Sequence, residues 1–450
     1  MKTLIAVVAA VLGIVLGGAG PAAADGAKAG SDIQVAQTLG DRDLTVVIRR
    51  PDAPPAPLRI DVVTHAGSPA GRLELRASTA GETVSTTKVD LGATPGFHSG
   101  TLRVDRAGPW ELALDDGTQV ATVPFVVPAL VLSPWEKATY GGFIVAGALL
   151  LTALALAVTG RSRLALLPTG GMTAALATAV TTALLSPVIP APPAPGTQLD
   201  PTYDTVNDPY QRTPVEHFSR PPVNLATSMD GQDLRLSMTD GATGRPVDDL
   251  LVHHNAFVHL VVVSPSGRME HLHPVRVAPG EYRARLNASE AGVHAVAAEL
   301  ARRGGGVQLV RSSVRVAAPT AAPAQQGSAD LDTAIGPAGT PSTITANFGT
   351  PDLQPWLGMA GHMIVVGPVG ATHTAVTAPV WAHVHAMIPQ TPGRQDRPDE
   401  SVAAYGPEVR FTYTFPQPGR YLVWIQAARD YSVITVPMVI DVPPKKEPQQ

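Results

Sequence analysis

The chain of 450 residues is long enough for about three domains of ordinary size. Its 33 basic and 37 acidic side chains give a net charge of −4, which excludes a nucleic-acid-binding protein driven by bulk electrostatics. The absence of cysteine excludes disulfides, thiolate metal sites and a cysteine nucleophile, so any bound metal must be held by histidine, methionine or carboxylate side chains.

The first 24 residues have the three regions of a secretory signal peptide. Lys2 supplies positive charge, Leu4–Leu16 is an apolar run too short to span a bilayer, and Pro21–Ala24 offers small residues for cleavage. We therefore predict a signal peptide at 1–24 and export of the rest of the chain. The alternative is an uncleaved membrane anchor.

The region from 31 to 128 has the pattern of a β-sandwich. Short runs such as Leu44–Ile48, Leu58–Val62 and Leu73–Arg76 alternate apolar and polar residues, and glycine and proline separate them at close spacing. This pattern predicts a sandwich of short strands at 31–128.

Two uncharged segments, 140–160 and 164–188, predict transmembrane helices. At 1.5 Å per residue, a helix of about twenty residues spans the hydrocarbon core of a bilayer. The connector between them contains Arg161 and Arg163, and the positive-inside rule places it in the cytoplasm. The lipid bilayer is thus a predicted partner, with the N- and C-terminal domains on the extracytoplasmic side of the cell membrane. The alternative is a single span with Leu164–Val188 lying at the membrane interface, which leaves the C-terminal half in the cytoplasm.

The segment 189–222 is rich in proline and irregular, which predicts an extended stalk with little to bury. Two further units follow, at 223–317 and 328–443, and they repeat one ordered series of elements. Each series begins with a valine-rich strand, at Phe257–Val263 and Ala360–Val366, and a histidine lies near the start of that strand. A His-x-His sequence then follows in each unit, at His271–His273 and His383–His385.

The closing hairpins of the first and last units also match. The strands Ala121–Val127 and Ile434–Ile440 carry a proline at the same point, which predicts an edge strand or a bulge, where no ladder donor is needed. The rest of the chain outside the two apolar segments is therefore predicted to be β.

This series of elements resembles the YtkA-like/FixH-like extracytoplasmic β-sandwich domains of bacterial exported proteins. The resemblance rests on an ordered set of sequence elements: an Asp-Leu dipeptide, a histidine at the valine-rich strand, a His-x-His sequence, and closing strands that contain Gly-Arg-Tyr and Val-Pro. It covers Pro222–Val316 and Gly336–Val442 well and Ile33–Val127 only in its closing hairpin. It implies immunoglobulin- or cupredoxin-like modules, often associated with copper or other heavy metals. The predicted fold class is therefore mainly β: tandem immunoglobulin/cupredoxin-like β-sandwiches plus a two-helix transmembrane hairpin.

Strand geometry predicts what the histidines can do. Residues i and i+2 of a strand point to the same face, so each His-x-His pair can converge, and the single histidine of the preceding strand can face it. Three imidazoles with an open position suit Cu(II) or Zn(II), and a thioether would favour Cu(I). We thus predict one metal site in each unit, weakening below a pH of about 6.5. The candidate ligands are His259, His271, His273, His362, His383 and His385, with Met269 and Met387 as auxiliary ligands.

The alternative is that these histidines are structural, forming a hydrogen-bonded rim or a satisfied core. No carboxylate stands at a supporting interval, and only Glu270, His253 and His254 remain as auxiliary candidates. His253 and His254 alternate faces in a strand, so at most one of them is expected in any site. The usual hydrolase, phosphate-loop, metalloprotease and dinucleotide motifs are absent, so we expect no enzyme. Two hypotheses follow: a membrane-anchored extracytoplasmic binding protein that captures or relays a metal ion such as copper, or a structural or adaptor ectodomain for another envelope protein, with no metal site.

Overall fold

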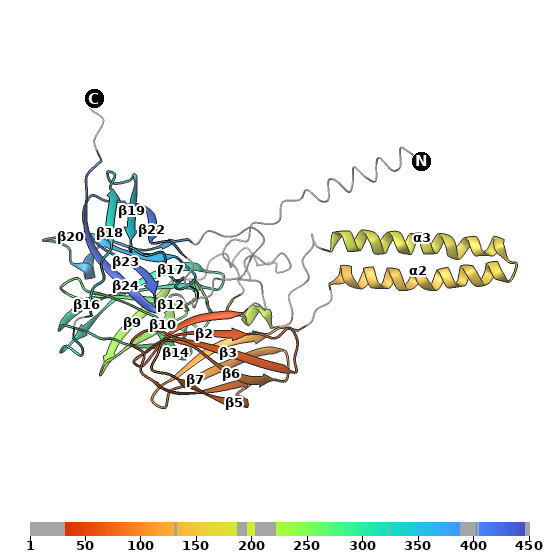
Figure 1. Ribbon diagram of the computed structural model, residues 1–450, viewed down its shortest axis with the longest axis horizontal. Helices are drawn as coiled ribbons and strands as arrows, with labels where there is room; N and C mark the ends of the chain where they lie inside the picture. The colour runs from red at the N-terminus through yellow and green to blue at the C-terminus, as the bar shows by residue number, and fades with distance from the viewer. Residues whose placement is uncertain are drawn as a thin grey trace, which may run out of the picture.

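The computed structural model describes residues 32–129, 133–186, 196–202, 222–322, 324–387, 402 and 405–445. The predicted signal peptide at 1–24 lies outside these residues, and so does most of the predicted stalk at 189–222. The predicted fold class is confirmed: the described chain is mainly β, with antiparallel sheets in tandem sandwiches and two long apolar helices. In Figure 1 the two helices extend together away from the β-domains.

The first sandwich consists of two four-stranded sheets. Leu73, Leu75 and Ala77 are fully buried, whereas the residues between them are partly exposed, which is the period of two expected for a strand with one face on the core. In spatial order the sheets contain β1 (Ile33–Leu39), β2 (Arg42–Arg49), β3 (Ala56–Thr64) and β6 (Gly96–Val104), and β5 (Glu82–Leu91), β4 (Gly71–Thr79), β7 (Gly108–Asp115) and β8 (Val120–Val127).

The two helices form an antiparallel hairpin of α2 (Pro134–Val158) and α3 (Ser162–Leu185). Both are long and apolar enough to cross a membrane by length and composition. They approach closely because a small residue, Gly142, lies against Ala179, where an added Cβ would come within 2.8 Å of the alanine methyl carbon. The first helix begins six residues before the predicted start at 140, because Ser133 and Glu136 form a capping box at its N-terminus.

The described part of the predicted stalk, residues 196–202, packs against the sandwiches and is buried at Thr197 and at 200–202, whereas Leu199 is exposed. It contains the short helix η1 (Thr197–Leu199), and Asp200 is only 1% exposed. The Asp200 carboxylate pairs with the buried guanidinium of Arg50, and the amide of Val252 donates to the carbonyl of Pro201. The prediction of a stalk with little to bury is therefore wrong for these residues, because an ion pair that proline content does not reveal holds them against the first two sandwiches.

Asp200→Asn should destabilise the protein by about 3–5 kcal/mol, because it removes the carboxylate that pairs with the buried Arg50 guanidinium. The apparent unfolding temperature of the full chain measures the effect. The matched control is Asp90→Asn, which breaks an ion pair with Arg72 whose side chains are 74% and 62% exposed, and which should leave that temperature unchanged. Equal effects of the two variants would contradict the structural role of Asp200.

The second and third sandwiches are each built from two sheets. The second has β14 (Val275–Ala278), β15 (Glu281–Arg285), β10 (Asp233–Asp240) and β9 (Val223–Asp230) facing β11 (Leu250–Leu251), β16 (Gly292–Arg302), β12 (Val258–Val263) and β13 (Met269–Leu272), with β17 (Gly306–Val316) paired to β16. The third has β18 (Asp330–Ala334), β19 (Pro341–Asn347) and β22 (Glu408–Thr414) facing β21 (Val380–Ala386), β20 (Gly361–Val369), β23 (Gly419–Arg429) and β24 (Ser432–Val442).

The prolines in the closing hairpins lie where the sequence predicts them. Pro124 is in β8 and Pro437 is in β24, and both strands are at the edge of their sheets, which confirms the edge-strand prediction.

The second and third sandwiches pack against each other through the faces that point away from their own cores. Leu260 and Val262 of β12 join the core of the second sandwich, whereas Val261 and Val263 join an apolar cluster between the two sandwiches. All six residues of β12 are buried because both faces of the strand are covered. The third sandwich contributes Ile364, Val366, Ala378 and Trp424 to this cluster. Farther along the same two faces, the alternation continues with histidine.

The first sandwich closes this interface at one side. All seven residues of β1, an edge strand, are buried. The amide of Ala36 donates to the carbonyl of Asn255 and the amide of Thr38 donates to the carbonyl of His273, both at 2.7 Å. Ala36 also packs with Trp356 of the third sandwich. All three sandwiches therefore meet beside the histidines.

Candidate metal centre

Eight imidazole rings form one continuous cluster between the second and third sandwiches. The ring centroids of His259 and His383 lie 5.0 Å apart, and those of His271 and His362 lie 5.9 Å apart, so rings from the two sandwiches alternate in space. The cluster contains the six predicted ligands and two more, in order His253, His254, His259, His271, His273, His362, His383 and His385. The predicted set of the third unit, His362, His383 and His385, forms a group of its own, whereas the second unit's His259 and His271 are joined by His383 of the third unit, because the histidine-bearing faces pack on each other.

Strand register brings each predicted set together as expected. Val261 pairs with His271 across β12 and β13, and His259 is two residues before Val261 on the same face. Across β20 and β21, Ile364 pairs with His383 and His362 pairs with His385. The prediction that the single histidine of each unit faces the His-x-His pair is confirmed.

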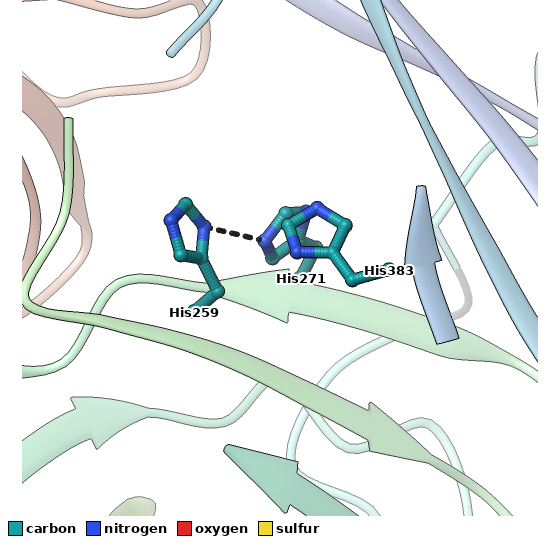
Figure 2. A group of neighbouring side chains, drawn as sticks. All are labelled: His259, His271 and His383. Carbon is teal, nitrogen blue, oxygen red and sulfur yellow. Dashed lines mark hydrogen bonds between the residues drawn. The ribbon is translucent and has the colours of Figure 1, made fainter. Parts of the chain in front are cut away.

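The tautomers of His259 and His271 are set by their outer hydrogen bonds. His259 Nε2 lies 3.0 Å from the carbonyl oxygen of His253, which only accepts, so Nε2 carries the proton. His271 Nδ1 lies 2.9 Å from Gln426 Oε1, whose amide nitrogen donates to Thr435, so this ring nitrogen also donates. The unprotonated nitrogens, His259 Nδ1 and His271 Nε2, then face each other at 3.4 Å, as Figure 2 shows.

Two triads of ring nitrogens share one member, His383. It lies with His259 and His271 in a group whose ligand atoms are all within 4.8 Å of one another, and with His362 and His385 in a second such group. Both ring nitrogens of His362, a fully buried residue, have no hydrogen-bond partner among the described residues. Buried polar atoms without partners are costly, so a cluster of this kind favours a bound cation.

Burial disfavours the charged form of five of these rings. It lowers the pKa of His273 to about 3, with a further contribution from His383. Burial and the neighbouring rings likewise hold the pKa values of His259, His271 and His362 well below the usual 6.5, and lower the pKa of His385 to about 2. Neutral imidazole is the form that binds metals, so the folded cluster is ready for a cation at neutral and mildly acidic pH.

A carboxylate missed by the sequence analysis lies at the cluster. Glu299 pairs with His259 across β16 and β12, and its Oε1 lies 3.4 Å from His383 Nδ1 and 3.8 Å from His253 Nε2. Burial alone would raise the pKa of Glu299, but the nearby His383, His253 and His254 rings lower it overall. The expectation that no carboxylate supports the histidines is wrong, because β16 joins β12 through a strand pairing that residue spacing does not reveal.

The expectation for His253 and His254 is also wrong. They lie in a turn in which His254 and Asn255 have φ values of 45° and 58°, so the two side chains do not alternate as in a strand. Their ring centroids are 3.7 Å apart. Both nitrogen ligands and a Glu299 oxygen lie within 4.8 Å of one another, in a third ligand group beside the two triads.

The predicted thioethers are placed less favourably. Met269 packs against the apolar cluster between the sandwiches, and Met387 is 56% exposed beyond the end of β21. A tryptophan is closer: the ring centroid of Trp356 lies 5.3 Å from that of His271 and 4.9 Å from that of His362. The environment of the described rings is therefore imidazole, indole and carboxylate.

Residues 328–444, the third sandwich, match a family model described as "Domain of unknown function (DUF8832)". No curated protein matches the chain. The family match does not test the resemblance to YtkA-like or FixH-like domains, which stays a prediction.

Several solved structures show partial similarity to this chain. One is the tetra-tandem repeat in the extending region of a large adhesion protein, with 11% identity, a match over 91% of this chain and 83% of that chain, and a TM-score of 0.17. A second is invasin, a bacterial integrin-binding protein, with 12% identity over 91% of this chain and 60% of that chain and a TM-score of 0.16. A third is a two-domain fibronectin type-III segment from chicken tenascin, with 10% identity over 50% of this chain and 99% of that chain and a TM-score of 0.15. Identities and TM-scores this low give no information on what this chain binds.

Proposed function

We propose that the chain is a membrane-anchored extracytoplasmic protein that captures or relays a metal ion, in particular copper, at the histidine cluster. The observation that carries this proposal is the pair of unprotonated nitrogens, His259 Nδ1 and His271 Nε2, that face each other at 3.4 Å beside His383. The apolar hairpin of α2 and α3 supports attachment to a membrane. The extracytoplasmic side rests on the predicted signal peptide and on Arg161 and Arg163 in the helix connector.

Two lone pairs pointing at each other repel unless a cation lies between them. Nitrogen ligands at about 2.0–2.1 Å from a tetrahedral ion lie about 3.3 Å from each other. The separation of 3.4 Å between His259 Nδ1 and His271 Nε2 agrees with this edge length. The outer hydrogen bonds to the His253 carbonyl and to Gln426 hold both rings in the orientation that ligation requires.

Copper is the favoured ion because the ligands are imidazoles without a thiolate. Cu(II) binds nitrogen ligands more tightly than the other divalent first-row metals, and Zn(II) is the runner-up that such a site also accepts. The proposed role is binding, with no catalytic step, because His362 and His259 are 0% and 1% exposed and leave no open face for a substrate.

The runner-up is a structural or adaptor ectodomain without a metal site. It is favoured by the apolar cluster of Val261, Val263, Ile364 and Trp424, which packs the second and third sandwiches without help from an ion. Under this alternative, the histidines only fill the polar end of the interface.

The two functions are separated by titrating the purified full chain in detergent micelles with Cu(II) and, separately, with Zn(II). We expect uptake of at least one Cu(II) by calorimetry, with quenching of the emission of Trp356, which lies beside His271 and His362. Trp356→Phe should remove most of the quenching and leave the uptake unchanged. Uptake of Zn(II) alone would replace copper by zinc, and no uptake of either ion would support the structural role.

A further inference from the structure

The turn that carries His253 and His254 lies between the surface and the buried cluster. The side chain of His253 is 18% exposed, that of Glu299 is 12% exposed, and that of His383 is 3% exposed. These three residues are in a row, since Glu299 Oε1 is 3.8 Å from His253 Nε2 and 3.4 Å from His383 Nδ1. Exposure therefore decreases stepwise along a line of potential metal ligands.

We propose that His253, His254 and Glu299 form a loading site, which takes Cu(II) from solution and passes it to the buried histidines. The inference rests on the proposed function and adds a second metal site and a direction of transfer to it. The ligand atoms of the three residues lie within 4.8 Å of one another. Two imidazoles and a carboxylate suit Cu(II) or Zn(II), and the negative charge of Glu299 attracts a dication.

The conformation of the turn supports a functional role. Left-handed φ values at two successive residues other than glycine, His254 and Asn255, cost free energy, and such strain is commonly retained at functional sites. The strain has a direct consequence, because it brings the His253 and His254 rings to a centroid distance of 3.7 Å. The first sandwich holds the turn in place, since the amide of Ala36 donates to the carbonyl of Asn255.

The loading site is connected to the buried triads by short steps. The ring centroids of His254 and His385 are 4.0 Å apart, and Glu299 lies beside His383, the residue that both buried triads share. Transfer then needs only the exchange of one ligand for the next, with copper remaining Cu(II). Leu309, which is 40% exposed, lines a small pocket together with Glu299 and His383.

The test is stopped-flow mixing of CuCl2 with the full chain in detergent micelles, followed by tryptophan quenching and by copper stoichiometry. The variant is His253→Gln with His254→Asn, because asparagine tolerates the left-handed φ of residue 254. We expect loading about tenfold slower or more and one Cu(II) fewer at saturation, with the final quenching unchanged. The control His373→Gln, at an exposed histidine of the third sandwich, should behave like the original chain.

Each outcome separates this inference from the function on which it rests. An unchanged loading rate and stoichiometry in the double variant would overturn the loading site and leave the buried copper site standing. No quenching and no uptake in the original chain would overturn both. Retained final quenching also shows that the variant is folded, because the rings beside Trp356 come from both the second and third sandwiches.

Discussion

Replacing His271 and His273 with alanine should abolish copper binding at the triad that joins the second and third sandwiches, although His383 remains. The reason is that this triad is composite: His259 and His271 come from the second sandwich and His383 from the third, whereas the triad of His362, His383 and His385 lies wholly in the third sandwich and keeps its ligands. Losing direct ligands should weaken binding at least as much as losing outer hydrogen bonds to ligands, which costs about 10–100-fold. The measurement is calorimetric titration of the full chain with Cu(II).

The reciprocal variant, His383→Ala with His385→Ala, should give a larger loss and abolish binding at both triads, because His383 belongs to both. Two independent sites would instead lose one ion in each variant and retain the other with unchanged affinity. The matched control replaces two histidines outside the cluster, His98 and His373, and should retain full binding. Half-stoichiometric binding in both test variants would contradict the sharing of His383 between the two triads.

Six of the eight histidines of the cluster could be predicted from the sequence, and their assembly into one cluster could not. The period of two places His271 and His273 on one face of a strand, and the internal repeat identifies His383 and His385 as their counterparts. Spacing within a strand does not say what covers that face. In this chain the cover is the matching face of the other sandwich, a tertiary contact between segments more than a hundred residues apart.

One signal of this contact was present in the sequence. The valine-rich strands at Val258–Val263 and Gly361–Val366 do not alternate with polar residues, and continuous apolar strands indicate that both faces are covered. Both of these strands lie next to a His-x-His pair, so the rule suggests that the two units cover each other's histidine-bearing faces. Glu299 follows only after the pairing of β16 with β12 is known.

The fold shows the same division between local and distant effects. Ser133 and Glu136 have the spacing of a capping box, which would have placed the start of the first helix correctly. The burial of Asp200 could not be found in this way, because its partner Arg50 lies 150 residues earlier. Local chemistry therefore sets the elements, and pairing between distant charges and faces decides where they dock.

The metal-free protein should lose stability as the pH falls from 6.5 towards 3. The folded cluster keeps the pKa of His273 at about 3 and those of His259, His271 and His362 well below 6.5, whereas the same histidines in an unfolded chain titrate near 6.5. Below 6.5 the unfolded state therefore binds more protons than the folded state, and the free energy of unfolding decreases. The loss is about 1.4 kcal/mol per pH unit for each such ring, or about 2 kcal/mol per ring between pH 6.5 and 5.

Denaturant unfolding of the full chain at several pH values measures this slope, and His271→Gln with His273→Gln should make it shallower because two buried rings are removed. The exposed His373→Gln should leave the slope unchanged, and an equal slope in all three proteins would contradict the argument.

The same pKa values alter the expectation for copper. In the folded state, protons compete for ring nitrogens such as His273 only near pH 3, so copper should stay bound below 6.5. Acid should therefore release copper by opening the interface between the second and third sandwiches, at the pH where unfolding begins.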